Sequence, residues 1–181
     1  MKIKNLILEL GETLIVSFVV ILLLYMFVAS VEVVSGASME PSFYTGERIL
    51  VDKVTKYFVP FKRGEIVVFL PPGDDTKHFI KRVVGVPGDI FKVIDCGVVI
   101  SKDGEKFKLE EDYLKQGTCT VGGTAIQEGR ALMVNAGQYA LLGDNRGDSL
   151  DSRILGLVDS KRIVGRVVFR FWPPNRIGFI N

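Results

Sequence analysis

Residues 13–43 read TLIVSFVVILLLYMFVASVEVVSGASMEPSF, and they join an apolar run to a loop rich in glycine and serine. The run from Thr13 to Val31 contains no charged residue, and its 19 residues suit a helix that spans a bilayer core, which takes ~17–25. We therefore predict a transmembrane helix at residues 13–34 after a short N-terminal segment, residues 1–12. The alternatives are a buried core helix and a signal peptide that is removed.

Basic residues predict the direction in which this helix crosses the membrane. Lys2 and Lys4 precede the apolar run, and Arg48 is the first positive residue after it. The flank with more positive charge stays in the cytoplasm. We therefore predict a single-pass protein of the cytoplasmic membrane, with residues 1–12 inside and residues 35–181 outside the cytoplasm.

The overall composition limits the partners of the chain. Lys+Arg number 23 against 21 for Asp+Glu, which gives a net charge of +2, and the absence of a basic block argues against nucleic-acid binding. One histidine and two cysteines cannot by themselves form a four-ligand zinc site. Outside the cytoplasm, Cys96 and Cys119 form either a disulfide or two unpaired buried thiols.

Beyond the loop, β-branched runs alternate with turn residues every 8–12 positions or so, a pattern typical of a β-rich domain. The expected strands lie at 47–52, 65–70, 79–86, 90–94, 139–142 and 163–171, with an edge strand or exposed loop at 57–61. Residues 95–130 are more polar and predict an inserted subdomain, with a short helical piece near 109–114. The predicted fold class is mostly β: an antiparallel sheet or barrel-like domain with a small inserted subdomain, preceded by one transmembrane helix.

Ser38 is the first candidate for chemistry, because small residues surround it in a glycine-containing loop. Small neighbours leave a hydroxyl accessible and let backbone N–H groups face a developing oxyanion. A serine nucleophile needs a base, and His78 and Lys81 lie three residues apart in a predicted strand, so their side chains face opposite sides. Phe79 and Val83 share the face of Lys81 and would lower its pKa by desolvation. Each of these residues also has an ordinary structural explanation when it is considered alone. Ser38 could be a turn residue, Lys81 a lysine at the edge of a sheet, and His78 a surface histidine.

The loop from Gly143 to Arg153 is the third candidate, with the sequence GDNRGDSLDSR. Its three aspartates suggest a calcium loop, but its two arginines would repel the ion and no glutamate closes the frame. The other interpretation is a loop in which Asp–Arg pairs hold the backbone while a serine hydroxyl reaches a site. A solvated acidic loop is the remaining alternative.

Four motifs in this order, behind a membrane segment, resemble the type I signal peptidases, which are membrane-anchored Ser/Lys proteases. The motifs are SGASMEP at 35–41, RGEIVVF at 63–69, KRVVGVPGD at 81–89 and GDNRGDSLDSR at 143–153. The resemblance implies that Ser38 is the nucleophile and Lys81 the general base, with no metal or cofactor. It also implies supporting roles, in which Ser149 orients the Lys81 amine, Asp151 pairs with Arg153, and Asp144 and Arg146 hold the loop.

The oxyanion hole is where this sequence departs from the family pattern. The resemblance implies that the backbone N–H of Ser38 is one donor. Some family members carry a serine or threonine two residues earlier, whose hydroxyl is the second donor, but this chain has Gly36 there. The expected second donor is therefore Ser35, a backbone N–H or water.

The implied function is the removal of N-terminal signal peptides from secreted preproteins at the outer face of the cytoplasmic membrane. Small side chains at the −1 and −3 positions of the substrate fit the A-x-A pattern of signal peptides. We expect an extended peptide lying along a strand, pockets lined by Met39 or by Ile66, Val67, Val68 and Phe69, and a monomeric enzyme. The alternatives are a catalytically silent membrane-anchored binding domain and a specialised peptidase for pilus or conjugation proteins; the membrane segment disfavours a self-cleaving regulator.

Aromatic residues beside prolines predict a contact with membrane lipid. Phe58, Phe61, Phe171 and Trp172 lie in this setting, and exposed aromatic rings favour the lipid–water interface. The alternative is that these four side chains belong to the core.

Overall fold

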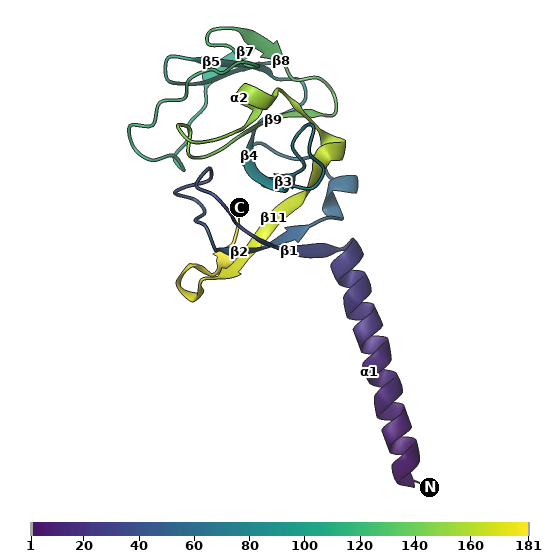
Figure 1. The fold of residues 1–181 in the computed structure, drawn as a ribbon. Helices are drawn as coiled ribbons and strands as arrows, with labels where there is room; N and C mark the ends of the chain where they lie inside the picture. The colour runs from purple at the N-terminus through teal and green to yellow at the C-terminus, as the bar shows by residue number, and fades with distance from the viewer. Residues whose placement is uncertain (1, 181) are drawn as a thin grey trace.

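The computed structural model describes residues 2–180, in which a long helix projects from a β-rich domain (Figure 1). Helix α1 (Lys2–Phe27) carries a 20-residue apolar window, Leu6–Tyr25, and none of this window is buried by the rest of the protein. The window is long and apolar enough to cross a membrane. Because the helix is exposed, it is not a core helix of the domain.

The end of α1 differs from the predicted helix at 13–34. The helix starts at Lys2, within the segment expected to precede it, and it ends at Phe27. Strand β1 (Ala29–Val33) follows and pairs antiparallel with β2 (Arg48–Asp52). Exposure alternates along β1, with Ser30 buried and Val31 and Val33 exposed, and the pairing with β2 makes these residues part of the β domain.

The main sheet is antiparallel, with the strand order β1-β2-β11-β3-β4-β9-β10 and β12 paired to β11. Its further strands are β3 (Ile66–Phe69), β4 (Phe79–Gly85), β9 (Gln138–Leu142), β10 (Val158–Asp159), β11 (Ile163–Trp172) and β12 (Gly178–Phe179). Strand β11 has register shifts against both β2 and β3, and such irregularities increase the local twist of a sheet. The predicted mostly-β antiparallel fold is confirmed.

Both faces of β3 are buried, which explains why this strand is an uninterrupted apolar run. Ile66 and Val68 pack into one core cluster, and Val67 and Phe69 pack into another on the opposite side. Side chains alternate along a strand, so a strand covered on both faces needs an apolar residue at each position. This strand lies beside β4, which carries Lys81.

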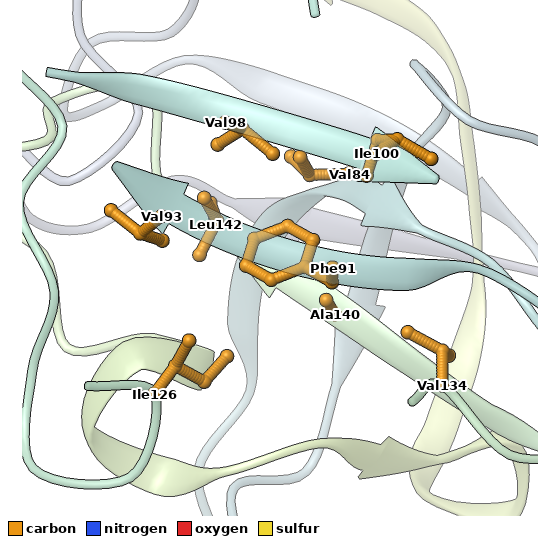
Figure 2. Close-up of a cluster of buried hydrophobic side chains, with 9 residues drawn as sticks. All are labelled: Val84, Phe91, Val93, Val98, Ile100, Ile126, Val134, Ala140 and Leu142. Atoms are coloured by element: carbon orange, nitrogen blue, oxygen red, sulfur yellow. The ribbon is translucent and has the colours of Figure 1, made fainter. Parts of the chain in front are cut away.

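A smaller sheet, with the order β7-β6-β5-β8, packs against the main one. Its strands are β5 (Ile90–Ile94), β6 (Gly97–Lys102), β7 (Glu105–Lys108) and β8 (Ala131–Met133). Figure 2 shows Phe91 of β5 close to Ala140 and Leu142 of β9, within the cluster of buried residues that joins the two sheets. This subdomain takes in residues 90–133 and so begins earlier and ends later than the predicted insertion at 95–130.

Short elements and turns complete the described part of the chain. These are α2 (Ser152–Leu155) and three short 3₁₀-helices, η1 (Thr55–Tyr57), η2 (Ser160–Arg162) and η3 (Pro174–Arg176). The expected helical piece at 109–114 is wrong, since this segment consists of turns and irregular backbone. Cys96 and Cys119 are joined by a disulfide within the smaller subdomain.

The four aromatic side chains expected at a lipid surface differ in exposure. Phe58 and Trp172 are exposed, at 80% and 49%, while Phe171 is half-buried. Phe61 is buried, because its ring packs edge-on against Tyr139 in the core. The prediction of a lipid contact is therefore wrong for Phe61.

Candidate active site

The loop after β1 carries Ser38 and is fixed by its apolar side chains. Met39 and Phe43 are almost fully buried and pack with Val34 in a core cluster. The Phe43 N–H donates a hydrogen bond of 2.9 Å to the Met39 carbonyl. With these side chains in the core, the loop presents residues 35–38 to a cavity of about 530 Å³. Met39 does not line this cavity, contrary to the prediction that it forms a substrate pocket.

Strand β4 places the Lys81 amine against the Ser38 hydroxyl. The Lys81 Nζ donates to Ser38 Oγ at 2.7 Å and to the Ile80 carbonyl at 2.8 Å. Lys81 is only 3% exposed, and its Nζ lies 5.5 Å from the centre of the Phe79 ring. This burial lowers the pKa of Lys81 to about 8, although the charges of Asp151 and Asp144 work against the shift. The amine can therefore lose its proton close to neutral pH and accept another from Ser38.

His78 lies beside the cavity but faces a different partner. It precedes β4, and its Nδ1 lies 3.1 Å from Glu32 Oε1 on β1. No hydrogen bond joins His78 to Ser38 in residues 2–180. Of the two candidate bases, only Lys81 is within hydrogen-bond reach of the serine.

Gly143 allows the polar loop to approach Ser38 closely. A Cβ at this position would overlap the Ser149 hydroxyl and the Ser38 carbonyl, so a larger residue would displace the loop. Next to it, the Asn145 N–H donates to the Ser38 carbonyl at 3.0 Å, and the Asn145 Nδ2 donates to the Ala37 carbonyl at 3.2 Å. The loop therefore fixes the backbone that carries Ser38.

Asp151 and Arg153 form the buried ion pair that the sequence predicts. The Arg153 Nη2 lies 2.8 Å from Asp151 Oδ2, and the Gly143 N–H donates to the same oxygen at 3.0 Å. Asp151 also accepts from the Arg153 N–H and so caps the start of α2. Burial acts to raise the pKa of Asp151, but the hydrogen bond and charge of Arg153 outweigh it and lower the pKa. The carboxylate stays charged and holds Gly143 in place.

Asp144 and Arg146 also hold the loop, but each does so through a partner outside it. Asp144 accepts two hydrogen bonds from Arg82 on β4, at 2.9 and 2.6 Å. Arg146 donates to the Gly143 carbonyl at 2.9 Å and pairs with Glu111 in the smaller subdomain. Arg82 and Glu111 were not among the predicted site residues; Arg82 directly follows Lys81 on the strand, which was the available signal, and no sequence signal pointed to Glu111.

Ser149 does not contact Lys81 in the way that was predicted. Its hydroxyl is buried against Gly143 and lies next to Asp151, whose pKa it helps to lower, and it makes no hydrogen bond to Lys81. The Ile80 carbonyl, on the same strand as Lys81, accepts the second hydrogen bond of the amine instead. No direct contact supports the expected orienting role of Ser149, which stays a prediction.

The backbone before Ser38 determines which N–H groups can face an oxyanion. The Ser38 N–H has no acceptor within the described residues 2–180, whereas the Gly36 N–H donates to Thr45 Oγ1 at 3.0 Å. Gly36 has a φ of +92°, a conformation that strains residues with a side chain. Of the expected second donors in the chain, Ser35 lines the cavity and is exposed.

The cavity wall contains only part of the predicted substrate pocket. Val68 lines it, together with Ile80 and Leu150. Ile66, Val67 and Phe69 are buried in the core clusters and do not line it. The prediction treated the strand as one surface, but its residues alternate between two faces, and only Val68 reaches the cavity.

Known proteins that are similar to this chain share one family description. Residues 7–172 match the family described as signal peptidase, peptidase S26. A signal peptidase I from Bacillus licheniformis is 36% identical over 179 residues, covering 96% of this chain and 93% of the relative. A probable signal peptidase I-2 from a Synechocystis species is 33% identical over 184 residues, covering 98% of this chain and 79% of the relative.

A crystal structure of a signal peptidase I from Enterococcus faecalis V583 is 27% identical, with a TM-score of 0.48, and the match covers 60% of this chain and 97% of that one. The family match spans both the Ser38 loop and the Gly143–Arg153 loop. The sequence relatives match nearly the whole chain, α1 included. The chain therefore belongs to the signal peptidase I family of serine endopeptidases.

Proposed function

We propose that the chain cleaves N-terminal signal peptides from secreted preproteins, with Ser38 and Lys81 as its catalytic dyad. The observation that carries this proposal is the 2.7 Å hydrogen bond between the buried Lys81 amine and the Ser38 hydroxyl. The pair lies at the wall of an open cavity of about 530 Å³, where a peptide can reach it. A catalytically silent binding domain would have no need of a desolvated amine at this distance.

The reaction starts from the neutral amine of Lys81. The amine takes the proton of Ser38 while Oγ bonds to the scissile carbonyl carbon, and the Ser38 N–H, with Ser35 as our proposed second donor, stabilises the oxyanion. When the C–N bond breaks, the Lys81 ammonium gives its proton to the leaving amine, and the mature protein departs. Water then attacks the ester carbonyl while Lys81 takes its proton; the bond to Ser38 Oγ breaks, Lys81 returns the proton to Oγ, and the signal peptide is released.

The supporting residues act by position in this proposal. Asp151 and Arg153 hold Gly143, whose lack of a side chain lets the loop contact Ser38. Asp144 ties the same loop to the strand of Lys81 through Arg82. The nucleophile and the base therefore keep their separation because both are fixed to one loop.

The substrate in this proposal is an extended peptide with small side chains at its −1 and −3 positions. The apolar part of the cavity wall, from Val68, Ile80 and Leu150, lies near the dyad and is where we place these side chains. A short A-x-A segment fits such a wall because it needs little room.

The membrane arrangement is part of the same proposal. Helix α1 crosses the cytoplasmic membrane with its N-terminus inside, and the β domain acts as a monomer on the outer side. The Cys96–Cys119 disulfide fits an oxidising compartment. The exposed rings of Phe58 and Trp172 are candidates for contact with lipid.

The pH dependence of cleavage tests the role of Lys81. Only the neutral amine acts as a base, and the pKa of Lys81 is about 8, so kcat/KM should rise about ten-fold per pH unit below pH 8 and level off above it. The measurement is a pH–rate profile on a preprotein substrate in detergent. The His78→Ala variant should keep the same inflection. A wild-type profile that is flat between pH 6 and 9, or an inactive His78→Ala variant, would contradict Lys81 as the base.

A further inference from the structure

A second cavity, of about 310 Å³, lies where α1 meets the β domain. Phe27, the last residue of α1, forms one wall, and residues of η1, η2 and β11 form the others. Four cationic side chains line it: Lys53, Lys56, Lys161 and Arg162. None of the described residues that line this basic cavity is acidic. Positive charge of this kind around a cavity favours an anion over a cation.

The carboxylates near Arg162 and Lys161 leave much of the charge of these two side chains in place. Asp75 pairs with Arg162 at 2.6 Å, but its side chain is 77% exposed, so water screens the pair. Asp159 accepts from the backbone N–H of Lys161 and caps η2. The Lys161 ammonium has no hydrogen bond or ion pair to any residue between 2 and 180.

Lys56 is the cation most strongly held in the cavity. Its Nζ donates to the Ile163 carbonyl at 2.6 Å and lies 5.1 Å from the centre of the Tyr57 ring. Burial, together with the charge of Lys53, lowers its pKa. An anion in the cavity would offset both effects, so anion binding and protonation of Lys56 favour each other.

The position of the cavity along α1 indicates which anion it meets. The apolar window ends at Tyr25, and Phe27 is two residues further on, roughly 3 Å at the rise of an α-helix. The Lys53 N–H donates to the Val28 carbonyl at 2.9 Å and ties the domain to the end of the helix. If α1 spans the bilayer, the cavity therefore lies at the level of the lipid headgroups.

We propose that the basic cavity binds the phosphate of an anionic phospholipid headgroup in the leaflet that faces the β domain. The apolar wall at Phe27 and the exposed rings of Tyr57 and Phe58 suit the glycerol and the first acyl carbons, which free phosphate lacks. Such a contact would fix the distance between the β domain and the bilayer surface. It would thereby also fix the distance of Ser38 and Lys81 from the membrane. The proposal rests on the membrane arrangement proposed above, and not on the chemistry at Ser38.

Lipid binding to the full-length protein tests the proposal without any use of cleavage. Delipidated protein in detergent is titrated with dioleoyl phosphatidylglycerol, with dioleoyl phosphatidylcholine and with inorganic phosphate, and the bound adducts are counted by native mass spectrometry. We expect phosphatidylglycerol to bind at least ten-fold more tightly than phosphatidylcholine. Because one cation near a membrane surface is worth about five-fold in affinity, Lys56→Gln with Lys161→Gln should weaken phosphatidylglycerol binding at least ten-fold.

A matched control separates the cavity from general charge. Lys102→Gln with Lys106→Gln removes the same charge from exposed positions on β6 and β7, and it should leave phosphatidylglycerol binding unchanged. If the Lys56/Lys161 variant does not fold, Lys161→Glu alone, at an exposed position, should still weaken the binding. Equal phosphatidylglycerol affinity in the cavity and control variants would overturn the proposal. Phosphate binding as tightly as phosphatidylglycerol would overturn the assignment to a lipid.

Discussion

Replacing Lys81 by methionine is expected to lower kcat/KM for a preprotein by about 10³-fold or more, because the variant has no base to take the Ser38 proton. The same change should not destabilise the fold. Burial lowers the pKa of Lys81 from 10.5 to about 8, so below pH 8 the unfolded chain holds this proton more tightly than the native protein does. That difference costs about 3 kcal/mol of the free energy of unfolding at pH 7, and the cost disappears as the pH rises past 10.5.

Methionine removes this cost, but it also removes the two hydrogen bonds of the amine, each worth about 1 kcal/mol. The net effect at pH 7 is an expected rise of about 1 kcal/mol in the free energy of unfolding, measured by denaturant titration. Lys106→Met, at an exposed site on β7, is the control and should change neither property. Loss of activity together with a large loss of stability would indicate a structural lysine and would contradict the dyad.

Replacing Asp144 by asparagine should lower the free energy of unfolding by about 3–5 kcal/mol. The variant leaves the Arg82 guanidinium, only 7% exposed, without its counter-charge. Asp144 also acts to raise the pKa of Lys81, so its loss should move the inflection of the pH–rate profile to lower pH. Denaturant titration measures the first effect, and the profile measures the second.

Asp75→Asn gives the matched control for this prediction. It removes a carboxylate from an Asp–Arg pair of the same length, 2.6 Å, but the Asp75 side chain is 77% exposed. Exposed pairs are worth about 1 kcal/mol or less, so the control should be nearly neutral. If both variants lost the same stability, the buried Asp144–Arg82 pair would not be what holds the loop to β4.

The sequence predicted the fold class and the desolvated setting of Lys81, because both depend on local patterns. The β-branched run at 65–70 predicted a strand, and the structure has β3 there, with its alternate residues buried in two clusters. Phe79 lies two residues before Lys81 and so shares its face of the strand, which predicted that the amine is desolvated. The lowered pKa of Lys81 agrees with this prediction. Neighbours in a strand are fixed by its two-residue period, so their surroundings can be inferred without a fold.

The remaining features depend on contacts between distant parts of the chain. Arg82 and Asp144 are 62 residues apart, and Arg146 and Glu111 are 35 apart, so no local pattern connects them. The end of α1 was missed because apolar residues continue past Phe27 into β1, and composition alone does not separate a helix end from a half-buried strand.

The proposed role of Ser38 as the nucleophile of a signal peptidase is tested most directly by the cleavage products of one preprotein. These are compared between the wild type and the Ser38→Ala variant. Full-length protein in detergent is incubated with a preprotein, and the fragment masses give the cleavage site. We predict that wild type cuts once, after a small residue at the end of an A-x-A segment, and that Ser38→Ala, folded to the same degree, leaves the preprotein intact. The same fragments from Ser38→Ala at a comparable rate would contradict the claim.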